Sequence, residues 1–391
     1  MNIADDIKYI GVNDHQVDLF EGQFVVPLGM AYNSYLVIDE KTVVFDTVDR
    51  NFASEWLSNL AAALEGREVD YLVVQHMEPD HSASIAEFMA AHPRTTIVSS
   101  AQAFVMMKGY FGNDWADRRL VVKEGDVLDT GKHKFLFVAA PMVHWPEVIV
   151  TYDQADKILF SADGFGKFGA NDVEDPEGWD CEARRYYFGI VGKYGSQVQA
   201  LLKKAAGLEI KKIFPLHGPI HDTPEMIAHV VSQYDTWSSY RVESEGIFIA
   251  YTSVYGNTKV AALELKKLLE ERGVGKVAIA DLARDDMHES IEDAFRYGTL
   301  VLATTTYNAG VFPKMYEFIH HLIERNYQSR KIALIENGSW APLAAKVIKE
   351  LFANSKDIAF CDPVVSIKCA LNDESRAKMI ALADCLAKDN K

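Results

Sequence analysis

The sequence has few cysteines, and none of them are spaced in a way that would build a cluster. Its 391 residues include four cysteines, Cys181, Cys361, Cys369 and Cys385, and each stands alone. Without a Cys-x-x-Cys pair the chain has no rubredoxin-type, ferredoxin-type or zinc-ribbon site, and free thiols fit a reducing compartment. Any electrons that the protein uses must therefore come from another protein or from a reduced cofactor.

Long hydrophobic runs, a signal peptide and a positive net charge are also missing. No apolar run reaches the ~20 residues that a membrane-spanning helix needs. The start of the chain, Met1 to Asp6, has no signal-peptide pattern. The formal net charge of -16 disfavours nucleic acid and anionic membrane surfaces as partners. We therefore expect a cytoplasmic protein with no nucleic acid and no membrane among its partners.

What is present is the composition of a globular chain whose pattern changes near residue 245. Hydrophobic residues make up 49% and charged residues 25% of the sequence, values that allow a sizeable core. Residues 35–45 predict a β-hairpin, and residues 197–206 and 224–234 predict amphipathic helices. Strands that first pair antiparallel, with helices interleaved, indicate a sheet sandwich flanked by helices.

From Gly246 onward the chain alternates strand, loop and helix. Such alternation predicts an α/β domain with a doubly wound parallel sheet, in which ligands bind beyond the carboxyl ends of the strands. Residues 236–245 have no strong period, so we expect a linker there between domains that span residues 1–245 and 246–391. The buried strands of the second domain are predicted at residues 247–251, 277–280, 299–303 and 331–335.

Four metal-binding side chains lie within six residues directly after a predicted strand. The strand covers Tyr71 to Val74, and the run that follows is His76-Met77-Glu78-Pro79-Asp80-His81. Imidazole and carboxylate are ligands that iron, manganese and zinc accept. A solvated turn is the alternative, because Pro and Asp favour turns, but two histidines and two acids at this spacing are rare by chance. The run predicts a metal site.

Three later segments repeat the arrangement of a hydrophobic strand followed by one more ligand. These are residues 135–138 before His144, residues 157–160 before Asp163 and residues 212–215 before His217. Together with the first run they would give two metal ions about three or four ligands each, with one carboxylate shared and coordination positions left open. The candidate ligands are His76, Glu78, Asp80, His81, His144, Asp163 and His217.

The strand ends of the second domain carry loops of small polar and aromatic residues. The first loop, residues 252–258, lacks both the Gly-Lys-Ser/Thr of a nucleotide triphosphate loop and the Gly-x-Gly-x-x-Gly of dinucleotide folds. It suits a phosphate at a helix N-terminus. The next two loops, residues 304–310 and 337–340, offer aromatic rings for a flat flavin. One such loop is often an ordinary turn, but three at successive strand ends predict a mononucleotide site. The candidate residues are Thr252, Ser253, Val254, Tyr255, Gly256, Asn257, Thr258, Thr304, Thr305, Thr306, Tyr307, Asn308, Ala309, Gly310, Asn337, Gly338, Ser339 and Trp340.

Taken together, these motifs resemble those of the flavodiiron proteins, or A-type flavoproteins, over essentially the whole chain. The resemblance implies a metallo-beta-lactamase-like αββα sandwich followed by a flavodoxin-like FMN domain, in the minimal two-domain class. The third flavin loop, Asn337 to Trp340, departs from the Gly-Ser-Tyr-Gly-Trp pattern of several relatives. The shared segments are Tyr32-Asn33-Ser34-Tyr35, the H-x-E-x-D-H run at His76 to His81, His144-Trp145-Pro146, Glu182-Ala183-Arg184-Arg185-Tyr186-Tyr187, His217-Gly218 and Thr306-Tyr307-Asn308.

The resemblance also assigns roles to the candidate residues. Tyr32 and Trp145 would lie near the gas-binding pocket, and His221 would either support a ligand or be an ordinary loop residue. Reduced FMN and a diferrous pair together store the four electrons that dioxygen needs to become water, and two nitric oxide molecules need two electrons to give nitrous oxide. The implied activity is reduction of dioxygen, of nitric oxide, or of both. One iron would take His76, Glu78 and His144, the other would take Asp80, His81 and His217, and Asp163 would bridge them.

The resemblance also implies an external electron donor and a homodimer. Rubredoxin is the favoured electron donor, and a deazaflavin, used by some archaeal relatives, is the second option. If the two domains sit end to end, a flavin would be far from the irons of its own chain. The family solves this with a head-to-tail homodimer, and a dimer of dimers is a further option.

Two other functions stay open on the residues alone. The first is a dizinc hydrolase of the same sandwich fold, with the flavodoxin-like domain as a sensor. Hydrolases of this fold commonly carry H-x-H-x-D-H, whereas Glu78 supplies a carboxylate that suits iron better than zinc. The second is a pure electron carrier with a vestigial metal site, and the complete ligand set argues against it.

Overall fold

The computed structural model describes residues 6–389, which form two compact units that meet between Asp235 and Thr236. The predicted linker at residues 236–245 is not a bare connection, because helix α7 (Pro224–Ser238) runs into it and strand β16 (Ser244–Tyr251) begins within it. Trp237 in this segment is 1% exposed, so the segment packs against the protein. The domain boundary after residue 245 stays a prediction.

The first unit is built on two sheets that pack face to face. One has the strand order β1-β6-β7-β8-β9-β10 and the other β11-β12-β13-β14-β15. Pairing is antiparallel from β1 to β7 and parallel from β7 to β10, because helices connect the later strands. The bounds are β1 Ile7–Tyr9, β6 Tyr35–Val37, β7 Val43–Phe45, β8 Tyr71–Val73, β9 Thr96–Ser99, β10 Arg119–Val121, β11 Val127–Asp129, β12 Lys134–Ala139, β13 Ile149–Asp153, β14 Ile158–Phe160 and β15 Lys212–Phe214.

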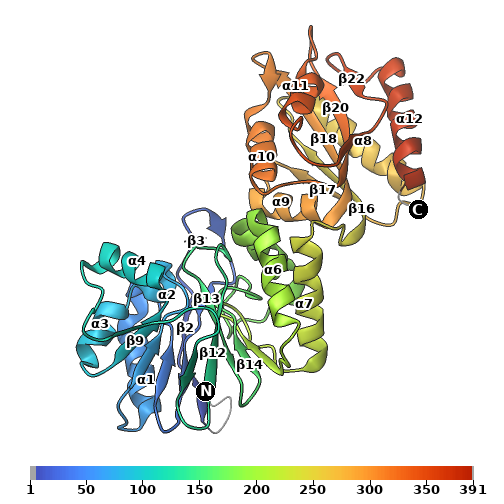
Figure 1. Cartoon of the computed structure of the whole chain (residues 1–391). Coiled ribbons are helices and arrows are strands. Elements are labelled where there is room, and N and C mark those ends of the chain that lie inside the picture. Colours follow the sequence, from blue (N-terminus) through green and yellow to red (C-terminus); the bar gives the residue numbers. More distant parts are fainter. Residues whose placement is uncertain (1–5, 390–391) are drawn as a thin grey trace. The chain divides into compact units, whose positions relative to one another are not determined.

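Helices cover the outer faces of both sheets, which gives the expected αββα sandwich (Figure 1). Two short antiparallel pairs, β2 (Val12–Asp14) with β5 (Met30–Tyr32) and β3 (Leu19–Phe20) with β4 (Phe24–Val25), precede the second strand of the first sheet. The helices are η1 Arg50–Phe52, α1 Ala53–Leu64, α2 Pro79–Ser82, α3 Ile85–Ala91, α4 Ala101–Phe111, α5 Trp179–Tyr186, the π-helical turn η2 Tyr187–Val191, η3 Gly192–Tyr194, α6 Gly195–Ala205 and α7.

Alternating side chains of the first sheet build two cores. Phe45 faces the second sheet, where its ring stacks on Phe160 with the centroids 4.0 Å apart. Its neighbour Val44 faces the other way and belongs to the cluster that contains Trp56 and Leu60 of α1. This alternation is the normal consequence of the two-residue period of a strand. It holds the strand ends that carry the candidate ligands in fixed positions.

The second unit is a parallel sheet with the order β17-β16-β18-β20-β21, and β22 also pairs with β20. In chain order this is 2-1-3-4-5, the flavodoxin-like arrangement of a doubly wound sheet. The bounds are β16, β17 Val277–Asp281, β18 Tyr297–Tyr307, β19 Gly310–Val311, β20 Arg330–Asn337, β21 Ile358–Phe360 and β22 Val365–Ile367, with helices α8 Asn257–Glu271, α9 Met287–Arg296, α10 Pro313–Glu324, α11 Ala344–Leu351 and α12 Asp373–Asp389.

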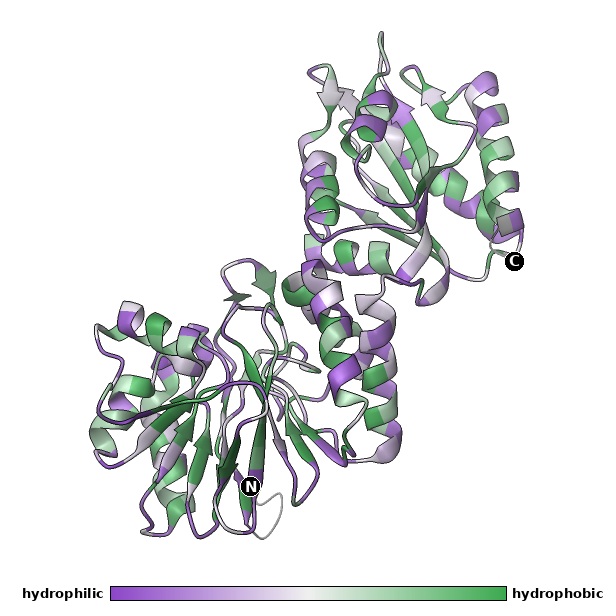
Figure 2. Cartoon of the chain, viewed as in Figure 1, coloured by the Kyte–Doolittle hydropathy of each residue, from purple (hydrophilic) through white to green (hydrophobic). Residues whose placement is uncertain are grey.

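Both faces of this sheet are covered by helices, with α8 and α12 on one face and α9, α10 and α11 on the other (Figure 1). Ile249 and Leu265 belong to the core beneath α8 and α12. The strands are mostly hydrophobic and the outer helical faces mostly hydrophilic (Figure 2). In the described part of the chain, no helix combines the length and the apolar character needed to cross a membrane.

Two predicted loops of this unit are shorter than expected. Helix α8 begins at Asn257, so Asn257 and Thr258 are helical. Strand β18 continues to Tyr307 and pairs antiparallel with β19 through a turn at Asn308 and Ala309, whose φ angles are 48° and 59°. Positive φ at both turn residues matches the twist of a two-residue hairpin, which explains why residues 304–307 extend the strand.

Candidate functional site

The H-x-E-x-D-H run changes conformation in its middle. His76 and Glu78 follow β8 in extended chain, with φ -61° and ψ 139° at Glu78, and the short helix α2 then begins at Pro79. Proline suits the first helical position because it needs no hydrogen-bond donor there. Asp80 and His81 therefore leave the chain from a helical turn. This switch sends the first two side chains to one place and the last two to another.

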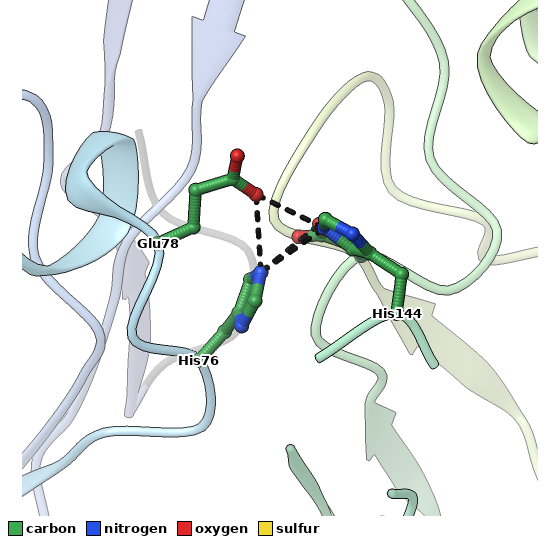
Figure 3. Close-up of side chains that lie close together, drawn as sticks. His76, Glu78 and His144 are labelled. Carbon is green, nitrogen blue, oxygen red and sulfur yellow. Dashed lines mark hydrogen bonds and ion pairs between the residues drawn. The ribbon is translucent and has the colours of Figure 1, made fainter. Parts of the chain in front are cut away.

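The first group combines His76 and Glu78 with His144, which lies between β12 and β13 (Figure 3). The Nε2 atoms of the two histidines are 3.2 Å apart. Glu78 Oε2 lies 3.2 Å from Nε2 of His76 and 3.0 Å from Nε2 of His144. All three donor atoms thus face one point.

The second group combines Asp80 and His81 with His217, which follows β15. The Nε2 atoms of His81 and His217 are 2.9 Å apart. Asp80 Oδ2 lies 3.4 Å from the first of these nitrogens and 3.3 Å from the second. This group therefore repeats the composition of the first, two imidazoles and one carboxylate.

Asp163 lies between the two groups and presents one oxygen to each. Its Oδ2 is 3.1 Å from Nε2 of His144 and 3.5 Å from Nε2 of His76. Its Oδ1 is 3.4 Å from Nε2 of His81 and 4.0 Å from Nε2 of His217. All seven predicted ligands are thus brought together, in the two groups that the family resemblance implies.

Protonation at this site is governed by the mutual attraction of imidazoles and carboxylates. Burial opposes the charged form of His144, but Asp163 and Glu78 raise its pKa to about 9. Burial likewise disfavours ionised Asp163, yet His76, His144 and His81 hold its pKa well below the usual range. The site therefore gathers positive charge around its carboxylates, and a divalent cation can take the place of these protons.

Several buried carboxylate oxygens of the site have no hydrogen-bond partner among the described residues, and bound metal ions would satisfy them better than protons alone. Both carboxylate oxygens of Asp80 and Oδ1 of Asp163 are buried and have no hydrogen-bond partner among the described residues. Buried polar atoms normally find a partner, and histidine nitrogens with carboxylate oxygens form a donor set that iron or zinc accepts. The donor set therefore fits two bound metal ions.

Several residues that support the ligands were missed in the sequence. Glu147 accepts hydrogen bonds from Nδ1 of His76 at 2.9 Å and from the backbone N–H of Met77 at 2.8 Å. Nδ1 of His217 lies 2.7 Å from the carbonyl oxygen of Ala31. These contacts come from segments far apart in the chain. The only local signal was a glutamate three residues after His144.

Tyr186 was quoted within a shared segment but not given a role. Its side chain is 0% exposed, and its ring packs against that of His217 with the centroids 5.5 Å apart. Burial, followed by the charges of Asp163 and Glu78, raises the pKa of its hydroxyl well above 10. The hydroxyl has no hydrogen-bond partner among the described residues, so a neutral donor is held near the carboxylates.

The three predicted supporting residues differ in their distance from the ligands. Trp145 lies edge-on to His76, with the centroids 5.3 Å apart. Tyr32 packs its ring 6.1 Å from that of His217 and lines a cavity of about 540 Å³ together with Glu78 and Asp80. His221 instead bonds to the carbonyl oxygen of Phe165 at 2.9 Å and packs against Trp179.

A further cluster of acids and histidine has a different countercharge. His133 lies 2.8 Å from Asp153 through Nδ1 and 3.2 Å from Asp6 through Nε2. Lys132 Nζ lies 2.6 Å from Asp6 Oδ2 and 2.9 Å from Asp156 Oδ2. The lysine occupies the position that a cation would take, so this cluster is an ion-pair network.

The predicted mononucleotide residues meet at a cavity of about 530 Å³ at the carboxyl edge of the second sheet. None of the described residues that line it is charged. The rings of Tyr255 and Trp340 at its border are 93% and 89% exposed. The lining residues are Ser253, Val254, Tyr255, Asn257, Thr258, Thr305, Thr306, Tyr307, Asn308, Ala309, Asn337, Gly338, Ser339, Trp340, Ala341, Leu343 and Cys369.

Four predicted residues do not line this cavity. Thr252 and Thr304 are fully buried, and their hydroxyls hydrogen-bond to each other at 2.7 Å. Gly256 is the residue before helix α8, and Gly310 is the first residue of β19. Cys369, two residues after the end of β22, lines the cavity although it was interpreted only as an isolated thiol. Nothing in its local sequence pointed to this position.

Comparisons with known proteins match this geometry. Residues 30–218 match the ODP family beta lactamase. The chain is 30% identical over 353 residues to the anaerobic nitric oxide reductase flavorubredoxin of Pectobacterium atrosepticum, covering 87% of this chain and 68% of that protein. It is also 30% identical to the flavorubredoxin of Salmonella paratyphi B over 351 residues, covering 87% of this chain and 72% of that one.

Two solved structures match the whole chain. One is the rubredoxin oxygen:oxidoreductase from Desulfovibrio gigas, with a TM-score of 0.92 and 25% identity over 100% of this chain and 98% of that chain. The flavodiiron protein from Giardia intestinalis has the same fold, with a TM-score of 0.90 and 24% identity over 99% of this chain and 97% of that chain.

Proposed function

We propose, from the premise that this chain belongs to the flavodiiron protein family, that it reduces dioxygen to water, nitric oxide to nitrous oxide, or both. The protein is an oxidoreductase whose cofactors are FMN and a non-haem diiron centre. The observation that carries the proposal is the pair of matched ligand groups with one oxygen of Asp163 directed to each. Such an arrangement leaves room for a small diatomic substrate at both ions.

The proposed ligand sets follow the two groups. Glu78 supports iron over zinc, because hard anionic oxygen donors stabilise the ferric state that a redox cycle visits. When bound, the irons would supply the sites at which substrate is held and electrons are transferred. The ligands would be His76, Glu78 and His144 on one side, Asp80, His81 and His217 on the other, and Asp163 between them.

The buried donors near the ligands would act on the substrate. Tyr186 holds a neutral hydroxyl that has no competing partner, so it can donate a hydrogen bond to an oxygen atom of the substrate. Tyr32 lines the adjoining cavity. The reaction consumes four electrons and four protons for each dioxygen, or two of each for every two nitric oxide molecules, and the protons must cross this polar lining.

The neutral cavity of the second unit would hold the FMN. The phosphate suits the backbone N–H groups and hydroxyls at the start of α8, from Ser253 to Thr258, where the helix dipole favours an anion. Tyr255 and Trp340 would cover the faces of the flavin ring. Their large exposure supports this role, because nothing else occupies the rings' surfaces.

The external donor and the assembly are the finer parts of the proposal. Rubredoxin is the proposed donor, because the sequence has no Cys-x-x-Cys pair of its own and the D. gigas protein is described as a rubredoxin oxygen:oxidoreductase. We further propose a head-to-tail homodimer that brings each flavin to a partner's irons. The dizinc hydrolase is not favoured, because Glu78 supplies a carboxylate that suits iron better than zinc. The electron carrier is not favoured, because it leaves the complete ligand set without a use.

Stopped-flow reoxidation tests the proposal. The fully reduced, iron-loaded protein is mixed separately with dioxygen and with nitric oxide while the FMN absorbance is followed. Fast reoxidation by either gas, without release of peroxide in the case of dioxygen, is the expected result, and the faster gas identifies the preferred substrate. If both gases give only the slow, peroxide-forming oxidation of a bare flavin, the proposed diiron function is wrong.

A further inference from the structure

The two ligand groups are matched in their direct ligands. Each has two imidazoles and one carboxylate, and each faces one oxygen of Asp163. Direct ligands of the same kind and charge give two metal ions similar reduction potentials. Any lasting difference between the two ions must therefore come from the residues that the ligands contact next.

Those outer contacts are not matched. Nδ1 of His76 donates to Glu147, whose side chain is completely buried and whose other oxygen, Oε2, has no hydrogen-bond partner among the described residues. In the second group, Nδ1 of His217 donates to the neutral carbonyl of Ala31, and Nδ1 of His81 has no partner among the described residues. Only one of the two groups thus has a carboxylate on the far side of a ligand ring.

Glu147 is held firmly in this position. Its Oε1 also accepts the backbone N–H of Met77 at 2.8 Å, and its backbone carbonyl accepts the hydroxyl of Ser100 at 2.8 Å. In the described part of the chain no lysine or arginine forms an ion pair with Glu147, so the ring of His76 is its main electrostatic partner. The Nε2 atom of His76, in contrast, faces Glu78 and His144. The ring therefore carries its proton on Nδ1 and offers Nε2 to a metal.

We propose that Glu147 is a positioning residue that makes the two metal ions unequal, so that the ion held by His76 is reduced after the ion held by His81 and His217. A hydrogen bond to an ionised acceptor is stronger than one to a carbonyl. It makes the imidazole a stronger donor to its metal, and stronger anionic donation stabilises the ferric state. The inference rests on the proposed function, because it uses the proposed ligand sets.

Asp46 is the buried carboxylate that could oppose this effect. It accepts hydrogen bonds from the backbone N–H groups of Gln75 at 2.7 Å and His76 at 3.3 Å. It contacts no ligand ring, and its charge interacts with His81 in the second group. Loss of its charge should therefore act on the opposite ion. Asp46→Asn and Glu147→Gln form a matched pair of isosteric changes with opposite expected results.

The test is a stepwise reduction of the full-length, iron-loaded protein with dithionite, followed by low-temperature electron paramagnetic resonance of the half-reduced centre. In Glu147→Gln the ion at His76 becomes easier to reduce, so the two reduction steps move together and the maximal half-reduced signal falls at least about threefold. In Asp46→Asn that signal should stay or rise. The flavin potential, which belongs to the other unit, should be the same in all variants.

Each result bears on one claim. An unchanged half-reduced signal in Glu147→Gln with both irons bound would overturn the inference. If Glu147→Gln loses iron, the titration is repeated with Glu147→Asp, whose shorter side chain weakens the contact with His76. A half-reduced signal below that of the unchanged protein then supports the inference, and an unchanged signal overturns it. Equal loss of folded structure in both variants, measured by circular dichroism, would make Glu147 merely structural and overturn it. Absence of two irons in the unchanged protein would instead overturn the proposed function, and the inference with it.

Discussion

The two units place their candidate binding residues in opposite environments. His76, His81 and His217 have no exposed surface, whereas Tyr255 and Trp340 are 93% and 89% exposed. Buried charged ligands must be held by partners before a metal arrives, because an unpaired buried charge is costly. Exposed rings carry no such cost and can settle on a planar ligand when it binds. The fold therefore holds the candidate metal ligands in place before a metal binds, whereas the exposed rings of the flavin pocket would be ordered by the flavin itself.

The largest effect is expected where the prepared site has a single shared residue. Asp163→Ala removes an oxygen from both ligand groups, so the iron content should fall from about two ions per chain to well below one. FMN content should not change, because its cavity belongs to the other unit. Metal analysis and flavin absorbance on the same sample measure both.

Asp172→Ala is the matched control for this change. Asp172 belongs to the same unit, its side chain is 55% exposed, and it pairs with His15. It should keep both irons. Two irons retained in Asp163→Ala would contradict the bridging position of this carboxylate.

A smaller effect is expected at Tyr186, whose hydroxyl is not a candidate iron ligand and does not line the flavin cavity. Tyr186→Phe removes only the hydroxyl, so iron and FMN contents should stay the same while the turnover number falls by about tenfold to 100-fold. Steady-state gas consumption measures it. Tyr327→Phe is the control, because Tyr327 is also buried, and its hydroxyl likewise has no hydrogen-bond partner among the described residues, but it lies in the second unit. Equal turnover in the two variants would contradict a role of the Tyr186 hydroxyl in the reaction.

The open pocket should respond more weakly and only in its affinity for FMN. Trp340→Ala removes a ring contact worth about 1 kcal/mol beyond its buried area, so the dissociation constant of FMN should rise about fivefold to tenfold. Fluorescence titration of the flavin-free protein measures it. Tyr316→Ala, at a ring that is 50% exposed on α10, should leave the constant unchanged. If both variants bind FMN as the original protein does, Trp340 does not cover the flavin.

The smallest effect concerns the ion-pair network that His133 forms with Asp153 and Asp6 and that also includes Lys132. Burial opposes the charged form of His133, but Asp153 and Asp6 raise its pKa above the ordinary value. A raised folded pKa adds stability below the unfolded value of about 6.5, and this stability is lost as the pH rises through the folded value. The denaturation midpoint of the metal-loaded protein should therefore decrease from pH 6 to pH 8.

His133→Gln should reduce this decrease, because glutamine does not titrate. Lys132 and Asp39 also face the cluster, but neither changes charge in this range. The difference between the two proteins at each pH isolates the contribution of His133. A parallel pH dependence in both would show that another group causes it.

Local sequence predicted the parts of the protein that depend on neighbouring residues. The strands before His76, Asp163 and His217 were found because short apolar runs between polar turns have few other uses. Their convergence was expected because the end of each strand is followed by candidate site residues. The flavin loops were placed for the same reason, although the continuation of β18 to Tyr307 was missed, since a hairpin turn at Asn308 and Ala309 has no glycine at its centre.

Residues that work through a distant partner were not predictable in this way. Glu147 and Ala31 are separated from the ligands that they support by 71 and 186 positions. A buried glutamate gives no sign in the sequence of which ring it will meet. Tyr186 was visible as part of a segment shared with the family, but the lack of a hydrogen-bond partner for its hydroxyl among the described residues depends on the folded surroundings.

The sequence by itself determined the family, the ligand types, the absence of a Cys-x-x-Cys cluster and the order of the two units, because these depend on residue identity and on short-range periodicity. Only the tertiary structure showed how close the candidate ligands of each group lie, how Asp163 divides its oxygens, and that one ligand ring is backed by a carboxylate and its counterpart by a carbonyl. Hydrogen bonds and electrostatic interactions act over a few ångströms of space. The chain reaches those distances only when it is folded.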